Sequence, residues 1–277
     1  MCRWISYIGN PIPLETLITE PENSLICQSL SAKMGVNPTN ADGVGLGWYG
    51  RNNEPGVYHS VLPAWGDQNL REIAHQVESH LFLAHIRHST GTPVQSTNCH
   101  PFRYANWLFV HNGLIRGFHK IHRELLLAIA PEYFPAIKGS TDSEIIFYLA
   151  KTFGLAKNPI EAMEKAIGFI EDVAKAHDIE NPIQASFGIS DGETLYAIRY
   201  SSEGDSRTLF HTADPETMKE LMAKTPHADL FGSHAHAVVS EPLGDKLPGL
   251  WVPVEEATAI TINKGELKTQ SFTPKLP

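Results

Sequence analysis

The first half of the chain alternates between two periods of hydrophobic residues. A period of two, which is typical of β-strands, appears in residues 2–8, 82–88 and 107–110. A period of three to four, which is typical of amphipathic helices, appears near residues 24–30, 67–80 and 121–129. The last helix should end before Pro131, and the strand at 107–110 runs directly into His111-Asn112-Gly113. Strands and helices therefore follow one another through this half.

Two helices and then a set of strands are predicted for the second half. Thr141 and Glu144 have the spacing of a capping box ahead of the apolar run 145–149, and Pro159 opens a longer helix. After residue 182 the period is that of strands, with Asp191-Gly192 as a hairpin turn. These strands cover residues 184–190, 194–200, 207–212, 234–239, 257–263 and 267–272. This order predicts sheets packed between layers of helices.

Glycines at every second position follow Asn40-Ala41-Asp42, at Gly43, Gly45 and Gly47. A phosphate-binding loop would need a helix after such glycines, so that backbone N–H groups and the helix dipole face the anion. Trp48-Tyr49 and a turn follow instead, which indicates a strand. We therefore expect the glycines to let another backbone, such as that of the first strand, approach closely. We do not expect nucleotide binding here.

Composition and charge narrow the classes of protein. The 277 residues, 42% hydrophobic and 19% charged, are typical of a globular chain that buries one large core. The formal net charge of −9 argues against a surface for nucleic acid or for an anionic membrane. No apolar run reaches the length of about 18 residues that spans a membrane. Pro11, Pro13 and Glu15 interrupt the segment that could otherwise read as a signal peptide.

The three cysteines, Cys2, Cys27 and Cys99, cannot all pair, which fits a reducing cytoplasm. Cys27 lies in the helix predicted near 24–30, and we expect it in the core. Cys99 and His100 are neighbours in an extended segment, so their side chains should point to opposite faces. A catalytic pair of these two is therefore not expected.

Cys2 is a candidate nucleophile because of its position. If Met1 is removed, Cys2 carries both a thiol and a free α-amine. An α-amine has a pKa of about 7.7–8.0 and a thiol one of about 8.5, so the amine can accept the thiol proton close to neutral pH. Taken alone, Cys2 is more simply an ordinary residue at the start of a strand, and other motifs must decide.

Four segments in order change that interpretation: Cys2, Arg87-His88-Ser89-Thr90-Gly91, His111-Asn112-Gly113 and Thr141-Asp142. Together they resemble the class II glutamine amidotransferases, which are N-terminal-nucleophile hydrolases, over about residues 2–150. The resemblance implies an α+β fold, the four-layer αββα sandwich of that superfamily. It implies one domain of residues 1–277, in which 151–277 complete the sandwich, and it implies no cofactor and no metal.

The resemblance also assigns a role to each matching residue. Cys2 would attack the side-chain amide, and the Asn112 side chain with the Gly113 N–H would hold the oxyanion. Arg87 would bind the α-carboxylate of the substrate, and Asp142 its α-ammonium. Thr90 and His88 would complete the pocket, and His100 would support it. Many members of the family have Trp or Tyr at the position of His88.

No synthase half is recognisable after residue 150, so the chain looks most like the stand-alone γ-glutamyl hydrolases of the superfamily. The shared features are Met1-Cys2-Arg3, Asn40-Ala41-Asp42-Gly43 and Ser240-Glu241-Pro242-Leu243. This implies hydrolysis of glutamine or another γ-glutamyl compound through a Cys2 thioester, with ammonia, an amino acid, a dipeptide or a thiol-bearing amine departing. A separate synthase or peptidase subunit is the partner that this form implies.

Other interpretations remain open from the sequence. Arg87 could form an ordinary ion pair, Asp142 could be a first-turn acid, and Asn112-Gly113 could be a plain turn. A metal-dependent hydrolase could use His234 and His236, which share a strand face, with Glu241 and Asp245 nearby. A non-catalytic subunit that binds γ-glutamyl compounds is a further alternative.

Overall fold

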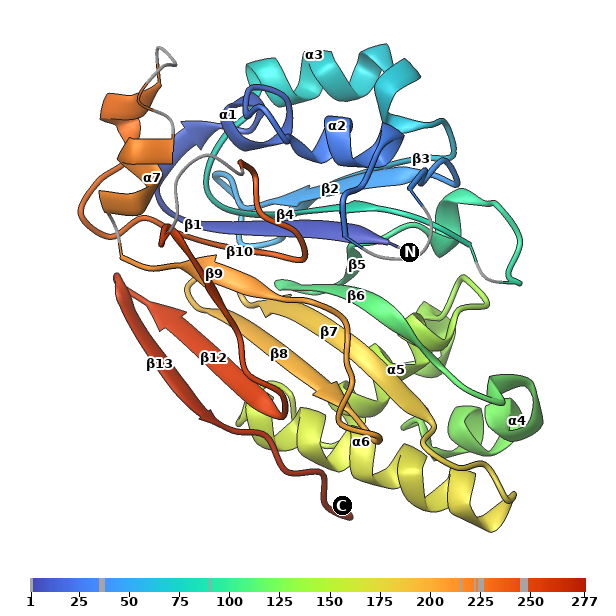
Figure 1. Cartoon of the computed structure of the whole chain (residues 1–277). Helices are drawn as coiled ribbons and strands as arrows, with labels where there is room; N and C mark the ends of the chain where they lie inside the picture. Colours follow the sequence, from blue (N-terminus) through green and yellow to red (C-terminus); the bar gives the residue numbers. More distant parts are fainter. Residues whose placement is uncertain are drawn as a thin grey trace.

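The computed structural model describes residues 2–34, 38–89, 91–214, 216–221, 223, 227–244 and 249–277. Two antiparallel sheets lie face to face, and helices cover the outer face of each (Figure 1). The predicted four-layer αββα sandwich is therefore confirmed. The apolar strand faces explain this arrangement, because each sheet must bury one face against helices and the other against the second sheet.

The first sheet has seven strands. Their order across the sheet is β11 (Trp251–Pro253), β9 (Phe210–Thr212), β10 (His236–Val239), β1 (Arg3–Pro13), β4 (Glu78–Ile86), β2 (Val44–Trp48) and β3 (Gly56–Ser60). Helices α1 (Glu15–Ile18), α2 (Leu25–Leu30) and α3 (Gln68–Gln76) cover its outer face, and α7 (Glu216–Leu221) lies beyond β9 in the chain.

The second sheet has six strands. Their order is β13 (Glu266–Ser271), β12 (Thr258–Asn263), β8 (Leu195–Ser201), β7 (Ile183–Ser190), β6 (Trp107–Ile115) and β5 (Phe102–Tyr104). Its outer helices are α4 (Phe118–Ala128), α5 (Asp142–Thr152) and α6 (Pro159–Ala176). Short 3₁₀ turns lie at Ala64–Gly66, Ser96–Asn98, Phe134–Ala136 and Ala228–Leu230.

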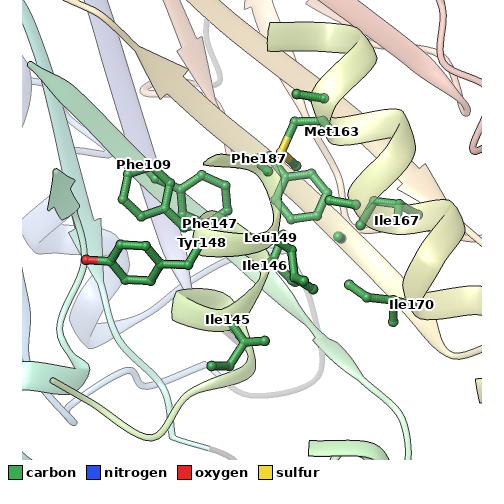
Figure 2. Close-up of a cluster of buried hydrophobic side chains, with 14 of the residues drawn as sticks. Phe109, Ile145, Ile146, Phe147, Tyr148, Leu149, Met163, Ile167, Ile170 and Phe187 are labelled. Carbon is green, nitrogen blue, oxygen red and sulfur yellow. The ribbon is translucent and has the colours of Figure 1, made fainter. Parts of the chain in front are cut away.

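Strand β4 illustrates how the side chains divide between layers. Phe82, Ala84 and Ile86 belong to the core beneath α1, α2 and α3, as the alternation predicted. Leu83 packs instead in the core between the two sheets. A third core fills the space between the second sheet and α5 and α6, where Figure 2 shows Phe109 and Phe187 among the helix side chains.

Most predicted elements are present, and three details were wrong. The first strand continues to Pro13 instead of ending near Ile8, and it tolerates prolines because β10 pairs with it only as far as Ile8. The strand predicted at 107–110 is longer, because β6 continues through His111-Asn112-Gly113 to Ile115, which excludes the alternative of a plain turn. Cys27 is exposed, because α2 turns Leu25 and Ile26 toward the core and residue 27 outward.

The glycines of β2 do admit another backbone, but not that of β1. A Cβ on Gly45 would lie 2.0 Å from the carbonyl oxygen of His100, and one on Gly47 would lie 2.9 Å from the Leu108 side chain. Strand β2 pairs with β3 and β4. The glycines therefore make room for the segment that leads into β5, on the second sheet.

Replacing Gly45 by alanine tests this contact. Because the new Cβ would meet the His100 oxygen, we expect the free energy of unfolding to fall by about 1–3 kcal/mol. Gly50→Ala is the matched control, since a Cβ at Gly50 has no described atom within 4 Å and should change stability by less than about 0.5 kcal/mol. Denaturant unfolding measures both, and equal stability of the two variants would contradict the close approach.

Candidate active site

The predicted site residues converge on one small cavity of about 40 Å³. Its described lining consists of Cys2, Arg87, His88, Ser89, Thr92, His100, His111, Gly113, Thr141, Asp142 and Ser143. Six of the eight predicted residues are in this lining. Asn112 is buried next to Gly113 in β6 but does not line the cavity, and Thr90 lies outside the described residues.

Both sheets contribute to this cavity. The pairing of β1 with β4 sets Arg3 opposite Ile86, so Cys2 and Arg87 are neighbours at the adjoining strand ends. From the other sheet, β6 supplies Gly113, and Asp142 begins helix α5. The site therefore depends on the packing of one sheet against the other.

The Cys2 thiol is half-buried and is held by the backbone of one residue. The sulfur accepts the His88 N–H at 3.3 Å and lies 3.5 Å from the His88 carbonyl oxygen. Burial raises the pKa of the Cys2 thiol, while the His88 N–H and the Arg87 guanidinium act to lower it. Because burial is the largest effect, a base is needed to form the thiolate near neutral pH.

Arg87 presents a buried cation to the cavity. Its guanidinium donates to Thr92 Oγ1 at 2.6 Å, to Ser89 Oγ at 3.2 Å and to the Asp42 carbonyl oxygen at 3.3 Å. Within the described ranges, its hydrogen-bond partners are all neutral oxygens and it forms no ion pair. The ordinary ion pair considered for Arg87 is therefore absent there, and the side chain can still accept a carboxylate.

Asp142 joins α5 to β6. One carboxylate oxygen accepts the Ile115 N–H at 2.8 Å, and the other accepts the Ser143 N–H at 2.8 Å. Gly113 in turn admits no side chain, because a Cβ there would lie 2.0 Å from the Gln184 carbonyl oxygen. These contacts fix the position of the carboxylate relative to the backbone of β6.

Three buried histidines lie under the site. His85 Nε2 is 3.1 Å from the His111 carbonyl oxygen, the His85 and His100 rings are 4.1 Å apart, and His111 Nδ1 is 2.8 Å from Ser143 Oγ. Burial lowers the pKa of His85 to about 3 and that of His111 to about 4, and it lowers the pKa of His100 well below its usual value. The group is therefore uncharged at neutral pH.

His111 and Ser143 were missed as site residues. His111 stands beside the predicted residue Asn112, and this was the one hint that it belongs to the site. Neighbouring residues of a strand point to opposite faces, however, so His111 does not point the same way as Asn112. Its ring stacks on Phe187 at 4.9 Å and reaches α5, which only the packing of the helix on β6 reveals.

Glu241, which the sequence marked without a role, binds the start of β1. Its carboxylate and the Arg3 guanidinium form an ion pair at 2.8 Å, and each residue is only 2% exposed. The same carboxylate accepts hydrogen bonds from Asn23 Nδ2 at 3.2 Å and from the backbone N–H groups of Lys33 and Met34 at 3.0 Å each. Arg3 Nη1 also donates to the Cys2 carbonyl oxygen at 2.9 Å, so the ion pair reaches the residue that bears the thiol.

Ser240 completes this attachment, which we call the β1 clamp (Arg3, Ser240 and Glu241). The Ser240 N–H donates to the Trp4 carbonyl oxygen at 3.0 Å, and Ser240 Oγ accepts the Trp4 N–H at 2.9 Å. The clamp therefore holds the backbone on both sides of Arg3. It therefore adds to the pairing with β4, which holds the same residues from the other side.

The histidine pair of the metal alternative does not form a ligand set. His236 is buried, with Nδ1 3.1 Å from Thr212 Oγ1 and Nε2 3.2 Å from the Gly265 carbonyl oxygen, and His234 is exposed ahead of β10. Asp245 lies outside the described residues. Among those described, the one group with suitable donors is Glu15, Glu20 and His227, which contains neither histidine.

A family model for the class II glutamine amidotransferases matches residues 18–274. The chain therefore belongs to this family, although the matched range begins after Cys2. It is 32% identical to the probable glutamine amidotransferase DUG3 of Saccharomyces cerevisiae, over 95% of this chain and 82% of that protein. It is also 32% identical to the gamma-glutamyl-hercynylcysteine sulfoxide hydrolase of Mycolicibacterium smegmatis, over 83% of this chain and 89% of that one.

Solved structures agree with the fold of the N-terminal-nucleophile hydrolases. A glutamine aminotransferase class-II domain protein from Silicibacter pomeroyi has a TM-score of 0.76 and 34% identity, covering 99% of this chain and all of that one. The glutamine phosphoribosylpyrophosphate amidotransferase of B. subtilis has a TM-score of 0.66 at 15% identity, covering 99% of this chain and 50% of that one. Among the described helices, none combines the length and apolar character needed to cross a membrane.

Glu241→Gln tests the β1 clamp. Removing one charge of a buried ion pair leaves the other uncompensated, so we expect the free energy of unfolding to fall by about 3–5 kcal/mol. Glu266→Gln is the control, because its pair with Lys268 is exposed and should contribute less than about 1 kcal/mol. Thermal or denaturant unfolding compares the two, and a clamp variant as stable as the control variant would refute the role given to Glu241.

Proposed function

We propose that this chain hydrolyses the γ-glutamyl amide bond of glutamine or of a γ-glutamyl compound, through a thioester on Cys2. The observation that carries the proposal is the meeting of Cys2, Arg87, Gly113 and Asp142 at one cavity, since these residues come from four separate segments. Membership of the family and the name of the mycobacterial relative support the same reaction class.

Arg87 and Asp142 would bind the amino-acid end of the substrate. The Arg87 guanidinium is buried among neutral oxygens, so an incoming α-carboxylate would supply the missing negative charge. Asp142 would accept the α-ammonium, and its bonds to Ile115 and Ser143 orient it for this. His88 and Thr90 would close the pocket, while the uncharged His100 would support it from below.

Cys2 would carry the chemistry once Met1 is removed. Its α-amine accepts the thiol proton, the sulfur bonds to the amide carbon, and the carbonyl oxygen becomes an oxyanion. The Asn112 side-chain NH₂ and the Gly113 N–H would hold that oxyanion. When the C–N bond breaks, the departing amine takes the proton from the α-ammonium. A water then cleaves the thioester, which releases glutamate and restores the thiol.

Residues 1–277 would act as a single catalytic domain in the cytoplasm. The family model covers nearly all of the second half together with the motifs from Arg87 to Asp142, which supports one unit instead of two. A separate synthase or peptidase subunit remains the partner that we infer for the released product, and no residue of the proposed mechanism requires a cofactor.

Cys2→Ala tests the nucleophile. In protein whose Met1 removal has been checked by mass spectrometry, the variant should lose all measurable release of glutamate from glutamine and from γ-glutamyl amides. Cys27→Ala is the matched control, because that thiol is exposed on α2 and its loss should leave turnover unchanged. Turnover by the Cys2 variant would falsify the assignment. Binding of γ-glutamyl compounds without turnover by the wild type would favour the non-catalytic alternative.

Asp142→Asn tests the ammonium site while keeping the size of the side chain and an acceptor for Ile115. Losing a charged hydrogen bond costs about 1.5–3 kcal/mol, so KM for glutamine should rise about 10- to 100-fold. The monoamide of glutaric acid, which has no α-ammonium, should be affected less than about twofold, and steady-state kinetics compares the two. An equal loss with both amides would remove Asp142 from the substrate site.

A further inference from the structure

Arg207 lies three residues before β9, in line with the strand ends that carry Cys2 and Arg87. Strand β1 pairs with β4 on one side and with β10 on the other, and β10 pairs in turn with β9 (Figure 1). Continuing these antiparallel registers past their last pairs gives a row of four residues: Arg87, Cys2, Pro242 and Arg207. The backbone hydrogen bond from the Ser240 N–H to the Trp4 carbonyl oxygen, at 3.0 Å, continues the register of β1 and β10, and the Thr208 hydroxyl donates to the Ser240 carbonyl oxygen at 2.8 Å, which keeps the segment before β9 beside the segment after β10.

Arg207 also belongs to the face of the sheet that carries the site. Leu209, two residues further on, packs in the core between the sheets, whereas Phe210 packs against the outer core. Residues two apart in an extended segment share a face, so Arg207 is on the inner side, as are Cys2 and Arg87. Neighbouring strands are about 4.8 Å apart, which puts the backbones of Arg207 and Cys2 about 10 Å from each other. Cys2 therefore has an arginine on each side.

The guanidinium of Arg207 is half-buried. Throughout the described residues it has no hydrogen bond and no ion pair, and its Nε is buried. Burial lowers the pKa of Arg207, and the Cys2 thiol and Asp205 act in the opposite direction, which places the cation within electrostatic range of the nucleophile. Neighbouring Arg116 is different, because it is paired with Glu203. A half-buried cation that forms no ion pair with a described residue is costly, and an anionic ligand would relieve that cost.

We propose that Arg207 binds an anionic group on the departing amine, so that the enzyme selects γ-glutamyl amides whose amine part carries a carboxylate. The inference rests on the function proposed above and extends it. With the α-carboxylate at Arg87 and the scissile carbon at Cys2, the amine part extends along the row toward Arg207. A guanidinium there forms two parallel hydrogen bonds with a carboxylate, and glutamine itself would leave the position unused.

The experiment compares three substrates with Met1-processed protein: γ-glutamylglycine, γ-glutamylglycinamide and glutamine. The first two have the same scissile bond and differ in the carboxylate of the amine part. Wild type should prefer γ-glutamylglycine. Arg207→Gln should lower kcat/KM for this substrate at least about tenfold and change the other two less than about twofold. Arg207→Lys should restore part of the preference, since it keeps the charge but not the paired donors.

Arg116→Gln is the matched control, an arginine of the same neighbourhood whose charge is already paired, and it should keep the wild-type ratio of the two glycine substrates. An equal loss for all three substrates with Arg207→Gln would mean that Arg207 acts on the Cys2 thiolate or on folding, and it would overturn the inference. No change with any substrate would overturn it as well. A wild type that hydrolyses none of the three would refute the proposed function and this inference together.

Discussion

The ion pair between Arg3 and Glu241 is the contact on which the site depends. It joins residues 238 positions apart in the chain and attaches the first strand to the segment after β10. Two charges are buried with it, and such burial is costly unless further hydrogen bonds satisfy both groups. The Glu241 carboxylate accepts such bonds from backbone N–H groups, and the Arg3 guanidinium donates one to the Cys2 carbonyl oxygen. The ion pair therefore serves to position the start of β1 more than to add net stability.

The two sheets contribute different parts of the site. The first sheet presents the Cys2 thiol and the Arg87 guanidinium, and the second presents the backbone of β6 and the carboxylate that opens α5. The core between them, with Trp4 and Leu108 among its members, helps to set the distance across the cavity. The Trp4 indole N–H also donates to Ser186 Oγ at 3.0 Å, which ties β1 directly to β7. The geometry of the candidate site therefore depends on how the two sheets pack.

Periodicity predicted sheets packed between layers of helices, because the strands alternate between two buried faces and the helices carry clear apolar stripes. The four-layer sandwich itself was implied by the resemblance to the family. Local spacing also placed Thr141 correctly as a cap, since Thr141 Oγ1 accepts the Glu144 N–H at 3.2 Å. The Glu144 carboxylate, however, accepts the N–H groups of Lys138 and Gly139 instead of completing the capping box. Local spacing cannot reveal such competition from a neighbouring loop.

Motif order predicted Cys2, Arg87, Gly113 and Asp142, but it could not supply the residues that tertiary packing recruits. Ser240 and Glu241 hold the start of β1 from the segment that follows β10, because the pairing of β1 with β10 brings these distant segments together, and single-sequence patterns do not contain such registers. The prediction that Cys27 lies in the core was wrong for a related reason. Helix α2 has six residues and is too short for its apolar stripe to fix which side faces the core.

The separation of Arg3 and Glu241 along the chain has a consequence for synthesis. A ribosome makes the N-terminus first, and the partner carboxylate emerges only after most of the sandwich has been translated. Throughout that interval the leading residues lack the contact that buries them. The removal of Met1, which the proposed function requires, would therefore be easiest on the nascent chain, before folding buries the residues that follow.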